Sequence, residues 1–359
     1  MTRTPPSRQV SPKGRRHKPR VVILLGAGAS RPLNIPTSAE FIDEEFYNSL
    51  SREARGVLLA IADYHKRDVY GLDVEQVLTV TDAADAIPPE LARNAGFAPL
   101  RTVGEKVREL IYRRCSAFDL KDSVYHYLPL LHQLTPKTTS RVSVFTTNYD
   151  RSFESCFIPA GFAKTLGLAD FKPRLVTGFG TGQGGGFVWA TEHFEADAAA
   201  VHAPEWPVFF HKLHGSVGWI EEDGHVHDVG MELQRESARQ PLMILPGVKR
   251  LPGNLVSRFS RRRLLEDLEM ADQVLVVGFS FRDDYIADIF DHAAHRRASR
   301  GPVPGIRIDP SESLPEESRI GWYNDAFARL RHIKRGFGKQ AEESTRWVRV
   351  EPRTGKLVY

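Results

Sequence analysis

The sequence lacks the features of a membrane protein, a secreted protein and a zinc protein. Only two of its 359 residues are cysteines, and two thiols cannot form a four-cysteine zinc site. No apolar run approaches the ~20 residues that span a bilayer, and the N-terminus lacks the apolar stretch of a signal peptide. His193, His225 and His227 do not follow a metal-ligand spacing. We therefore expect no metal, no membrane contact and a cytoplasmic location.

The first 20 residues contain no acidic residue but hold seven basic ones. Because the whole chain has a net charge of +4, residues 21–359 carry −3. Four prolines and the lack of a periodic apolar pattern predict that residues 1–19 form a disordered basic tail. We expect a solvated arm, with contact to nucleic acid or to an acidic partner as the alternative.

Short apolar runs alternate with helical patterns, which is typical of a parallel sheet covered on both faces. Arg20–Leu25 is such a run. Further strands are predicted at Arg141–Phe145, Arg174–Thr177, Pro207–Leu213, Pro241–Leu245, Val274–Val277 and, as the last one, Gly305–Ile308, with a hairpin at Trp219–Val229. The predicted fold class is α/β, with a Rossmann-like parallel sheet and helices on both of its faces.

The segment from about 50 to 135 carries three amphipathic patterns and no strong strand signal, which predicts a mainly helical insertion. Thr37 and Glu40 match a capping box, so a helix is expected to start there and run through Leu50. Helices are also predicted at Asp283–Arg296 and around Trp322–Leu330, and a loop at the glycine-rich residues 178–186. The predicted domain spans residues 20–340, followed by a C-terminal extension at 341–359.

A glycine turn, Gly26-Ala27-Gly28-Ala29-Ser30, directly follows the first predicted strand. Glycine allows close backbone approach, and a turn into a helix presents N–H groups, which together suit a nucleotide diphosphate. Arg31 stands where the dinucleotide fingerprint has its third glycine, so that fingerprint is incomplete. Alone, the segment fits an ordinary tight turn.

Three more motifs follow predicted strands: Thr146-Thr147-Asn148-Tyr149-Asp150, Lys212-Leu213-His214-Gly215-Ser216 and Gly278-Phe279-Ser280-Phe281. Ligands of open α/β sheets bind at the carboxyl ends of the strands, so four motifs at one edge indicate a binding site. Taken singly, Asn148 and Asp150 also fit a turn that satisfies backbone groups, and His214 also fits a core histidine.

Together, the four motifs resemble the NAD-binding and catalytic motifs of the sirtuin family. The resemblance implies NAD as the substrate, Asn148 as the residue that contacts the nicotinamide ribose and a water, and His214 as the general base. An asparagine can use both its carbonyl and its amide for these contacts. The implied cofactor-binding residues are Gly26, Ala27, Gly28, Ser30, Thr147, Asp150, Gly278, Ser280 and Asp309.

The sequence departs from the sirtuin deacetylases at three places. The zinc cysteines are missing, Ile35-Pro36-Thr37-Ser38 lacks the family's aspartate and arginine, and Phe281-Arg282-Asp283-Asp284 replaces the usual loop. The residues that hold the nicotinamide carboxamide are therefore not identified. These departures are closer to the bacterial sirtuin-like NADases, which consume NAD in anti-phage defence.

That resemblance implies an NAD glycohydrolase that forms a homo-oligomer. It also implies an activating or regulatory partner encoded nearby, for example an ATPase translocase or an Argonaute-type protein. Nucleic acid would act only indirectly or through the basic tail. Two other functions stay open: an NAD-dependent deacylase or ADP-ribosyl transferase, and a non-catalytic module that senses NAD or ADP-ribose.

Overall fold

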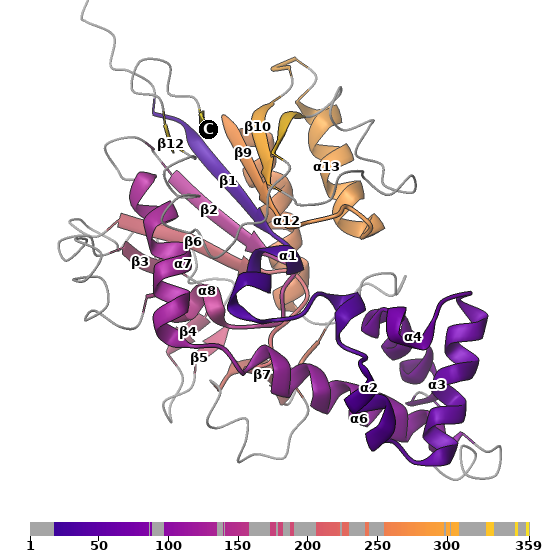
Figure 1. The fold of residues 1–359 in the computed structure, drawn as a ribbon. Helices are drawn as coiled ribbons and strands as arrows, with labels where there is room; N and C mark the ends of the chain where they lie inside the picture. Colours follow the sequence, from indigo (N-terminus) through magenta and orange to yellow (C-terminus); the bar gives the residue numbers. More distant parts are fainter. Residues whose placement is uncertain are drawn as a thin grey trace, which may run out of the picture.

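The structure is a computed structural model that describes residues 18–85, 87, 97–134, 139, 141–157, 173–176, 179–181, 187–189, 206–222, 225–229, 241–243, 255–297, 299–301, 303–308, 328–333, 349–350 and 357–358. These ranges form a parallel sheet with helices on both faces, a lobe of helices beside it, and a small antiparallel sheet (Figure 1). No helix within them is long and apolar enough to cross a membrane.

The main sheet confirms the predicted parallel arrangement. Every pair of neighbouring strands in it is parallel. The first strand, β1, lies in the middle of the sheet. The next strands of this sheet along the chain, β2, β3 and β6, lie on one side of β1, and the last three, β9, β10 and β11, lie on the other side. The direction of winding therefore reverses between β1 and β9, and ligands of such sheets bind at that reversal. In spatial order the strands are β11 (Ala328–Ile333), β10 (Val303–Ile308), β9 (Gln273–Val277), β1 (Arg20–Leu25), β2 (Arg141–Thr146), β6 (Trp206–Lys212) and β3 (Pro173–Val176).

The register of the strands brings the four motifs to one edge of the sheet. Leu25, the last residue of β1, lies opposite Thr146 of β2 and Val277 of β9. Thr146 in turn lies opposite Lys212, the last residue of β6. The segments that follow these strands therefore leave the sheet side by side, as the sequence pattern predicts.

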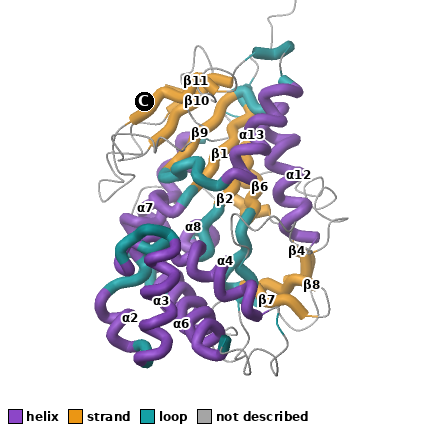
Figure 2. Tube along the Cα trace, turned by 90° about the vertical axis from the view of Figure 1, so that its right-hand side faces the viewer, coloured by secondary structure: helices purple, strands orange, loops and turns teal. Residues whose placement is uncertain are grey.

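Side chains of β1 alternate between two cores, one on each face of the sheet. Ile23 belongs to the core that contains α7, and Leu24 belongs to the core that contains α12 and α13. Figure 2 shows α7 on one side of the strands and α12 and α13 on the other. The bounds of these helices are Leu120–Gln133 (α7), Leu255–Met270 (α12) and Asp284–Arg296 (α13), and short α8 covers Ser152–Ser155.

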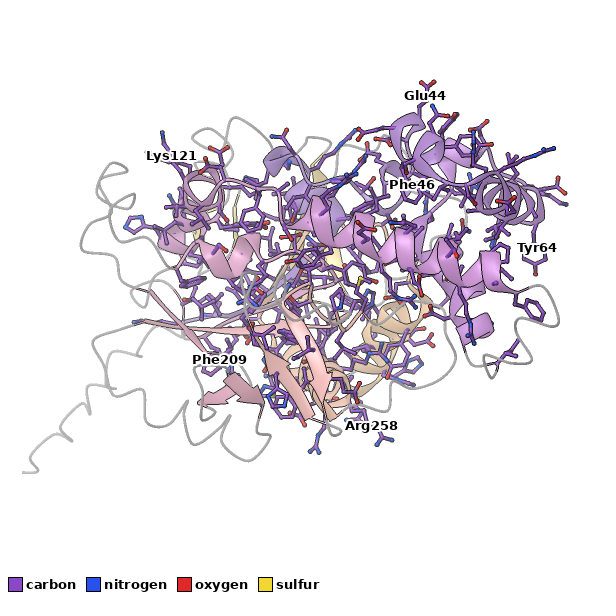
Figure 3. The ribbon with its side chains drawn as sticks, turned by 90° about the horizontal axis from the view of Figure 1, so that it is seen from below. Glu44, Phe46, Tyr64, Lys121, Phe209 and Arg258 are labelled. Atoms are coloured by element: carbon purple, nitrogen blue, oxygen red, sulfur yellow. The ribbon has the colours of Figure 1, made fainter. Side chains whose placement is uncertain are left out.

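The predicted helical insertion forms a lobe beside the sheet, at the lower right of Figure 1. Phe46 points into this lobe, whereas Glu44 and Tyr64 point away from it (Figure 3). Apolar side chains of the lobe belong to the same core as α7, so the lobe and that face of the sheet share one apolar interior. Its helices are α2 (Glu44–Ser49), α3 (Arg52–Tyr64), α4 (Val74–Asp85) and α6 (Ala98–Cys115), with a 3-10 turn, η3, at Val69–Gly71.

A second, four-stranded antiparallel sheet has the order β4, β5, β8, β7. The predicted hairpin is confirmed, because β7 (Trp219–Glu222) pairs antiparallel with β8 (His225–Asp228). The other two strands are β4 (Phe179–Thr181) and β5 (Phe187–Trp189). A separate two-stranded ladder joins β12 (Arg349–Val350) to β13 (Leu357–Val358).

Three sequence predictions are wrong in the structure. Phe179–Thr181 lies in the segment predicted as a loop but forms a strand, because β5 supplies a pairing partner. Ala328–Ile333 is a strand where a helix was expected to end, so β10 is not the last strand of the sheet. The predicted strand at 241–245 is not one of the three, because residues 244–245 lie outside the described residues; within 241–243 the pairing is a bridge between Met243 and Gly215.

The third error concerns the helix expected after Thr37. The capping box is present, since the Glu40 carboxylate accepts hydrogen bonds from the backbone N–H and the hydroxyl of Thr37 at 3.0 and 2.8 Å. It caps only a 3-10 turn, η2, at Ser38–Glu40. The α-helix α2 starts separately, capped by Asp43.

Residues 1–17, 309–327 and 341–348 lie outside the described residues, so the structure does not test the predicted tail or most of the C-terminal extension.

Candidate active site

Two of the predicted motifs interlock through their glycines at the reversal between β1 and β9. The N–H of Gly28 donates to the carbonyl oxygen of Gly278 at 3.0 Å. A Cβ on Gly26 would lie 2.5 Å from that same oxygen, and Gly278 has a φ of +60°. Only glycine fits such contacts and such a φ without strain. The turns after β1 and after β9 therefore form one closely packed backbone unit.

Asn148 is buried beside the glycine turn, with 8% of its surface exposed. Its Nδ2 donates to the carbonyl oxygen of Gly26 and to Oγ of Ser30, both at 2.9 Å. Because a carbonyl oxygen only accepts, these contacts fix the nitrogen end of the amide on that side. Its Oδ1 is buried and has no hydrogen-bond partner among the described residues. A buried acceptor left unpaired costs free energy, so Oδ1 marks a place where a ligand can donate.

A buried lysine holds the backbone of the Asn148 turn. Nζ of Lys212 donates to the carbonyl oxygens of Asn148, at 3.1 Å, and of Asp150, and it pairs with Glu154 at 3.3 Å. Oδ1 of Asp150 accepts from the N–H of Ser152 at 2.9 Å and from the hydroxyl of Ser152. The carboxylate of Asp150 is thus engaged in the turn itself, as aspartate is in many turns.

His214 lies on the turn after β6 and faces Asp283, which lies between β9 and α13. Its Nε2 is 2.7 Å from Oδ2 of Asp283, and both side chains are buried. This close contact joins a ring nitrogen to a carboxylate oxygen inside the protein. The other ring nitrogen, Nδ1, has no hydrogen-bond partner among the described residues.

Asp283 is fixed at the start of α13. Its Oδ1 caps the helix by accepting from the N–H groups of Tyr285, at 2.9 Å, and Ile286, at 3.3 Å. Burial acts to raise the pKa of Asp283, but the contact with His214 and these two N–H groups outweigh it and lower the pKa. Phe281, two residues earlier, has a φ of +59°, which is rare for a bulky residue and is typical of a constrained turn.

Asp283 is not among the residues that the sequence motifs assign to the site. The available signal was its place directly before a helical pattern, at the end of Gly278-Phe279-Ser280-Phe281-Arg282-Asp283. That signal predicts a helix cap. It does not predict the partner, which is 69 positions earlier in the sequence.

Comparison with known proteins identifies the family. The SIR2-like domain matches residues 142–326, which is more than half of the 359 residues. The chain belongs to the SIR2-like family. The match starts within β2 and includes Asn148, His214, Gly278 and Asp283, whereas the glycine turn after β1 precedes it.

Solved structures of Sir2 proteins are similar to this SIR2-like chain along most of its length. A complex of Sir2 with a p53 peptide and NAD+ has 12% sequence identity, covers 91% of this chain and 92% of its own, and gives a TM-score of 0.41. A complex of a Sir2 homologue with NAD has 14% identity, covers 91% and 88%, and gives a TM-score of 0.41. No curated protein matches the sequence.

The helical lobe of the SIR2-like protein also reaches the edge of the sheet that carries Asn148. The hydroxyl of Tyr149, next to Asn148, donates to Oε1 of Glu75 on α4 at 3.2 Å. Burial raises the pKa of Glu75 well above its usual value, and the charges of Asp73 and Asp283 raise it further. The carbonyl oxygen of Tyr149 accepts from the N–H of Val217, beyond His214, at 2.9 Å. Tyr149 thus connects the turns that carry Asn148 and His214 to the lobe.

The other predicted cofactor-binding residues have different surroundings. Ala27 and Gly28 are half-exposed, and so are Thr147, Gly278 and Ser280. Ser30 is buried behind Asn148. Asp309 lies outside the described residues, directly after β10.

Two weaker features have ordinary surroundings. The basic cluster on α12 is paired within its helix, with Arg262 and Arg263 bound to Glu266, while Arg258 points outward (Figure 3). Cys115 and Cys156 are free and buried. Within the described ranges, no group of histidine, cysteine and acidic side chains could hold a metal ion.

Proposed function

We propose that this SIR2-like protein is an NAD glycohydrolase, which releases nicotinamide and ADP-ribose from NAD. The observation that carries the proposal is the presence of two buried polar atoms on adjacent turns that have no hydrogen-bond partner in the described part of the chain: Oδ1 of Asn148 and Nδ1 of His214. They lie at the carboxyl edge of a parallel sheet, where such sheets bind nucleotides. Membership of the SIR2-like family and the four motifs support NAD as the substrate.

The chemistry needs one activated water and little acid catalysis. Breaking the bond between nicotinamide nitrogen and ribose C1′ returns the bonding electrons to the ring, so nicotinamide leaves neutral. The ribose carbon develops oxocarbenium character, as in glycoside hydrolysis. A water oxygen then bonds to C1′, and the proton that it loses completes the balance of nicotinamide, ADP-ribose and one proton.

The two unpartnered atoms suit this chemistry. Because the amide nitrogen of Asn148 is already bound to Gly26 and Ser30, Asn148 acts on the substrate as an acceptor only, through Oδ1. It holds the water or a ribose hydroxyl. His214 accepts the released proton at Nδ1, and the carboxylate of Asp283 orients the ring and stabilises the imidazolium that forms.

The remaining cofactor-binding residues divide into two groups in this proposal. Gly26, Ala27, Gly28 and Gly278 approach the nucleotide through their backbone, with Thr147 and Ser280 beside it and Asp309 at the adenosine ribose. Ser30 and Asp150 support Asn148 from behind.

We further propose that the enzyme is a regulated cytoplasmic effector of anti-phage defence, because uncontrolled loss of NAD is toxic. A homo-oligomer and an activating partner protein encoded nearby belong to this proposal.

The test is nicotinamide release from NAD by the full-length protein, alone and with the protein encoded beside it. His214→Ala and Asn148→Ala should each lower turnover by ~10²–10⁴-fold, which is the usual contribution of general base catalysis. His292→Ala and Asn48→Ala, two exposed residues of the same types, serve as controls and should leave turnover unchanged.

The same assay separates the other candidate functions. Release that requires an acylated peptide identifies a deacylase, and release that requires an acceptor protein identifies an ADP-ribosyl transferase. Saturable NAD binding without turnover, even with the partner, identifies a sensing module. Wild-type turnover in both alanine variants would show that the site lies elsewhere.

A further inference from the structure

A row of buried hydroxyl groups lies behind Asn148. Oγ of Ser30, which accepts from the Asn148 amide, is 3.3 Å from the hydroxyl oxygen of Tyr127. The Tyr127 hydroxyl is also 3.3 Å from Oγ of Ser152, and Ser152 is hydrogen-bonded to Asp150. All five side chains are buried. The row thus runs from the catalytic amide to a carboxylate, across three separate segments of the chain.

The two ends of the row determine the direction of every hydrogen bond in it. The carboxylate of Asp150 only accepts, so the single proton of the Ser152 hydroxyl is donated to it. Ser152 must then accept from Tyr127, and by the same argument Tyr127 accepts from Ser30. The proton of Ser30 is therefore not available to Asn148, and Ser30 accepts from the Asn148 amide nitrogen.

Tyr127 is held firmly in the middle of this row. It belongs to α7, is 1% exposed, and packs edge-to-face against Phe153 with ring centroids 5.2 Å apart. Burial, reinforced by the charge of Asp150, raises the pKa of the Tyr127 hydroxyl, so the group keeps its proton. It has the fixed position and the protonation state that the direction of the row requires.

We propose that Tyr127 is a positioning residue for Asn148. The Tyr127 hydroxyl donates to Ser152, which donates to Asp150, and it accepts from Ser30. Ser30 is thereby kept as an acceptor for the nitrogen end of the Asn148 amide. This inference rests on the proposed function, because the end of the amide that it exposes, Oδ1, is the one that receives the water or ribose hydroxyl. It also gives Asp150 a role in the site that needs no contact with the nucleotide.

Removing the Tyr127 hydroxyl leaves the proton of Ser30 without an acceptor. Ser30 can then donate to Asn148, which competes with the hydrogen bond from Nδ2 and leaves the carbonyl oxygen of Gly26 as the one acceptor that still holds the nitrogen end. The amide is then held less firmly, and whenever it turns it presents its nitrogen to the substrate and cannot accept from water. For Tyr127→Phe we expect kcat to fall about tenfold, the equivalent of one hydrogen bond, with KM changed less than about twofold.

A second readout does not depend on activity. In full-length protein labelled with ¹⁵N-asparagine, the side-chain signals of Asn148 are those lost in Asn148→Ala. Their hydrogen exchange should be slow in the wild type, because both N–H groups are bound, and about tenfold faster or more in Tyr127→Phe. Two variants on α7 are the controls: Ser123→Ala, whose buried hydroxyl donates to the backbone carbonyl of Ser152 and to no hydroxyl of the row, and Tyr125→Phe.

The outcomes separate this inference from the glycohydrolase proposal. Unchanged exchange and unchanged kcat in Tyr127→Phe would overturn the positioning role, and so would an equal change in Ser123→Ala, which would indicate general loosening. If the wild-type protein does not cleave NAD in any mixture, the glycohydrolase proposal fails. The exchange measurement still decides whether Tyr127 orients Asn148.

Discussion

At the scale of single residues, the environment of Asn148 restricts what this side chain can do. From the sequence, an asparagine offers a donor and an acceptor to a ligand. In the structure both N–H groups of the amide are bound inside the protein, so only Oδ1 can contact a ligand. The sequence identifies the residue and the edge of the sheet. The free atom depends on contacts with Gly26 and Ser30, more than 100 positions away.

Asp283 provides the sharpest test of a single charge. In Asp283→Asn the side chain can still cap α13 through its carbonyl oxygen, but the negative charge beside His214 is lost. A hydrogen bond or ion pair to a charged group contributes about 1.5–3 kcal/mol. In the proposed mechanism the imidazolium forms only during the reaction, so we expect kcat for nicotinamide release to fall by about 10–10²-fold, with little change in KM.

The matched control is Asp284→Asn, the exposed neighbour on the first turn of α13. It removes the same charge from the same helix end without touching His214. A thermal melt shows whether the cap survives in both variants. Equal losses of kcat in the two variants would attribute the effect to the helix end and not to the ion pair.

At the scale of secondary structure elements, the sequence predicts best where one physical signal dominates. β1, β2 and β9 are apolar on both faces because helices cover both sides of the sheet, and their positions were predicted within a residue or two. β4 is flanked by glycines, so only its pairing with β5 makes it a strand. β11 alternates apolar and basic residues, which is a strand signal that the helix prediction overlooked.

Helix α7 supports the glycine turn through a histidine that gives the protein a pH dependence. Nε2 of His126 is 2.7 Å from the carbonyl oxygen of Ala29, and burial lowers the pKa of His126 to about 4. In the unfolded chain the histidine has its ordinary pKa of about 6.5, so below that pH protonation favours the unfolded state. The contribution of His126 to the free energy of unfolding is therefore fully present above pH 6.5 and is lost as the pH falls toward 4. At pH 5 the loss from this group is about 2 kcal/mol.

Urea unfolding at pH 7.5 and pH 5 measures this contribution. His126→Gln can still donate to Ala29 but does not titrate. Between pH 7.5 and pH 5, the free energy of unfolding should therefore fall by about 2 kcal/mol less in this variant than in the wild type. His292→Gln, an exposed histidine on α13, should behave like the wild type. The same pH dependence in all three proteins would mean that His126 is not the group responsible.

At the scale of the whole molecule, the site is built from two parts that the sequence presents separately. The edge of the sheet supplies Asn148, His214 and the glycine turns, and its position follows from the parallel strand pattern. The lobe adds Glu75, which binds Tyr149 from 74 positions away. A helical pattern gives no direction for packing at that distance. For this reason, the sequence predicted the lobe but not its contact with the site.

The contact between the lobe and the sheet edge leads to a prediction about stability. Burial, with the charges of Asp73 and Asp283, raises the pKa of Glu75, so ionisation of this carboxyl disfavours the folded state. The stabilising, protonated form is present below the ordinary glutamate pKa and is lost as the pH rises through the raised folded value. Glu75→Gln keeps a neutral partner for Tyr149 and should unfold at higher urea concentration than the wild type at pH 8, with little difference at pH 4.5.

Two further variants identify the cause of that gain. Glu105→Gln, an exposed glutamate on α6 in the same lobe, should give no gain at either pH. Tyr149→Phe should lower the free energy of unfolding by about 0.5–1.5 kcal/mol, the net contribution of one hydrogen bond. In the double variant Glu75→Gln with Tyr149→Phe the two effects should not add, because both act on one contact. Additive effects would mean that Glu75 and Tyr149 stabilise the protein independently, and that the lobe is not joined to the Asn148 turn through them.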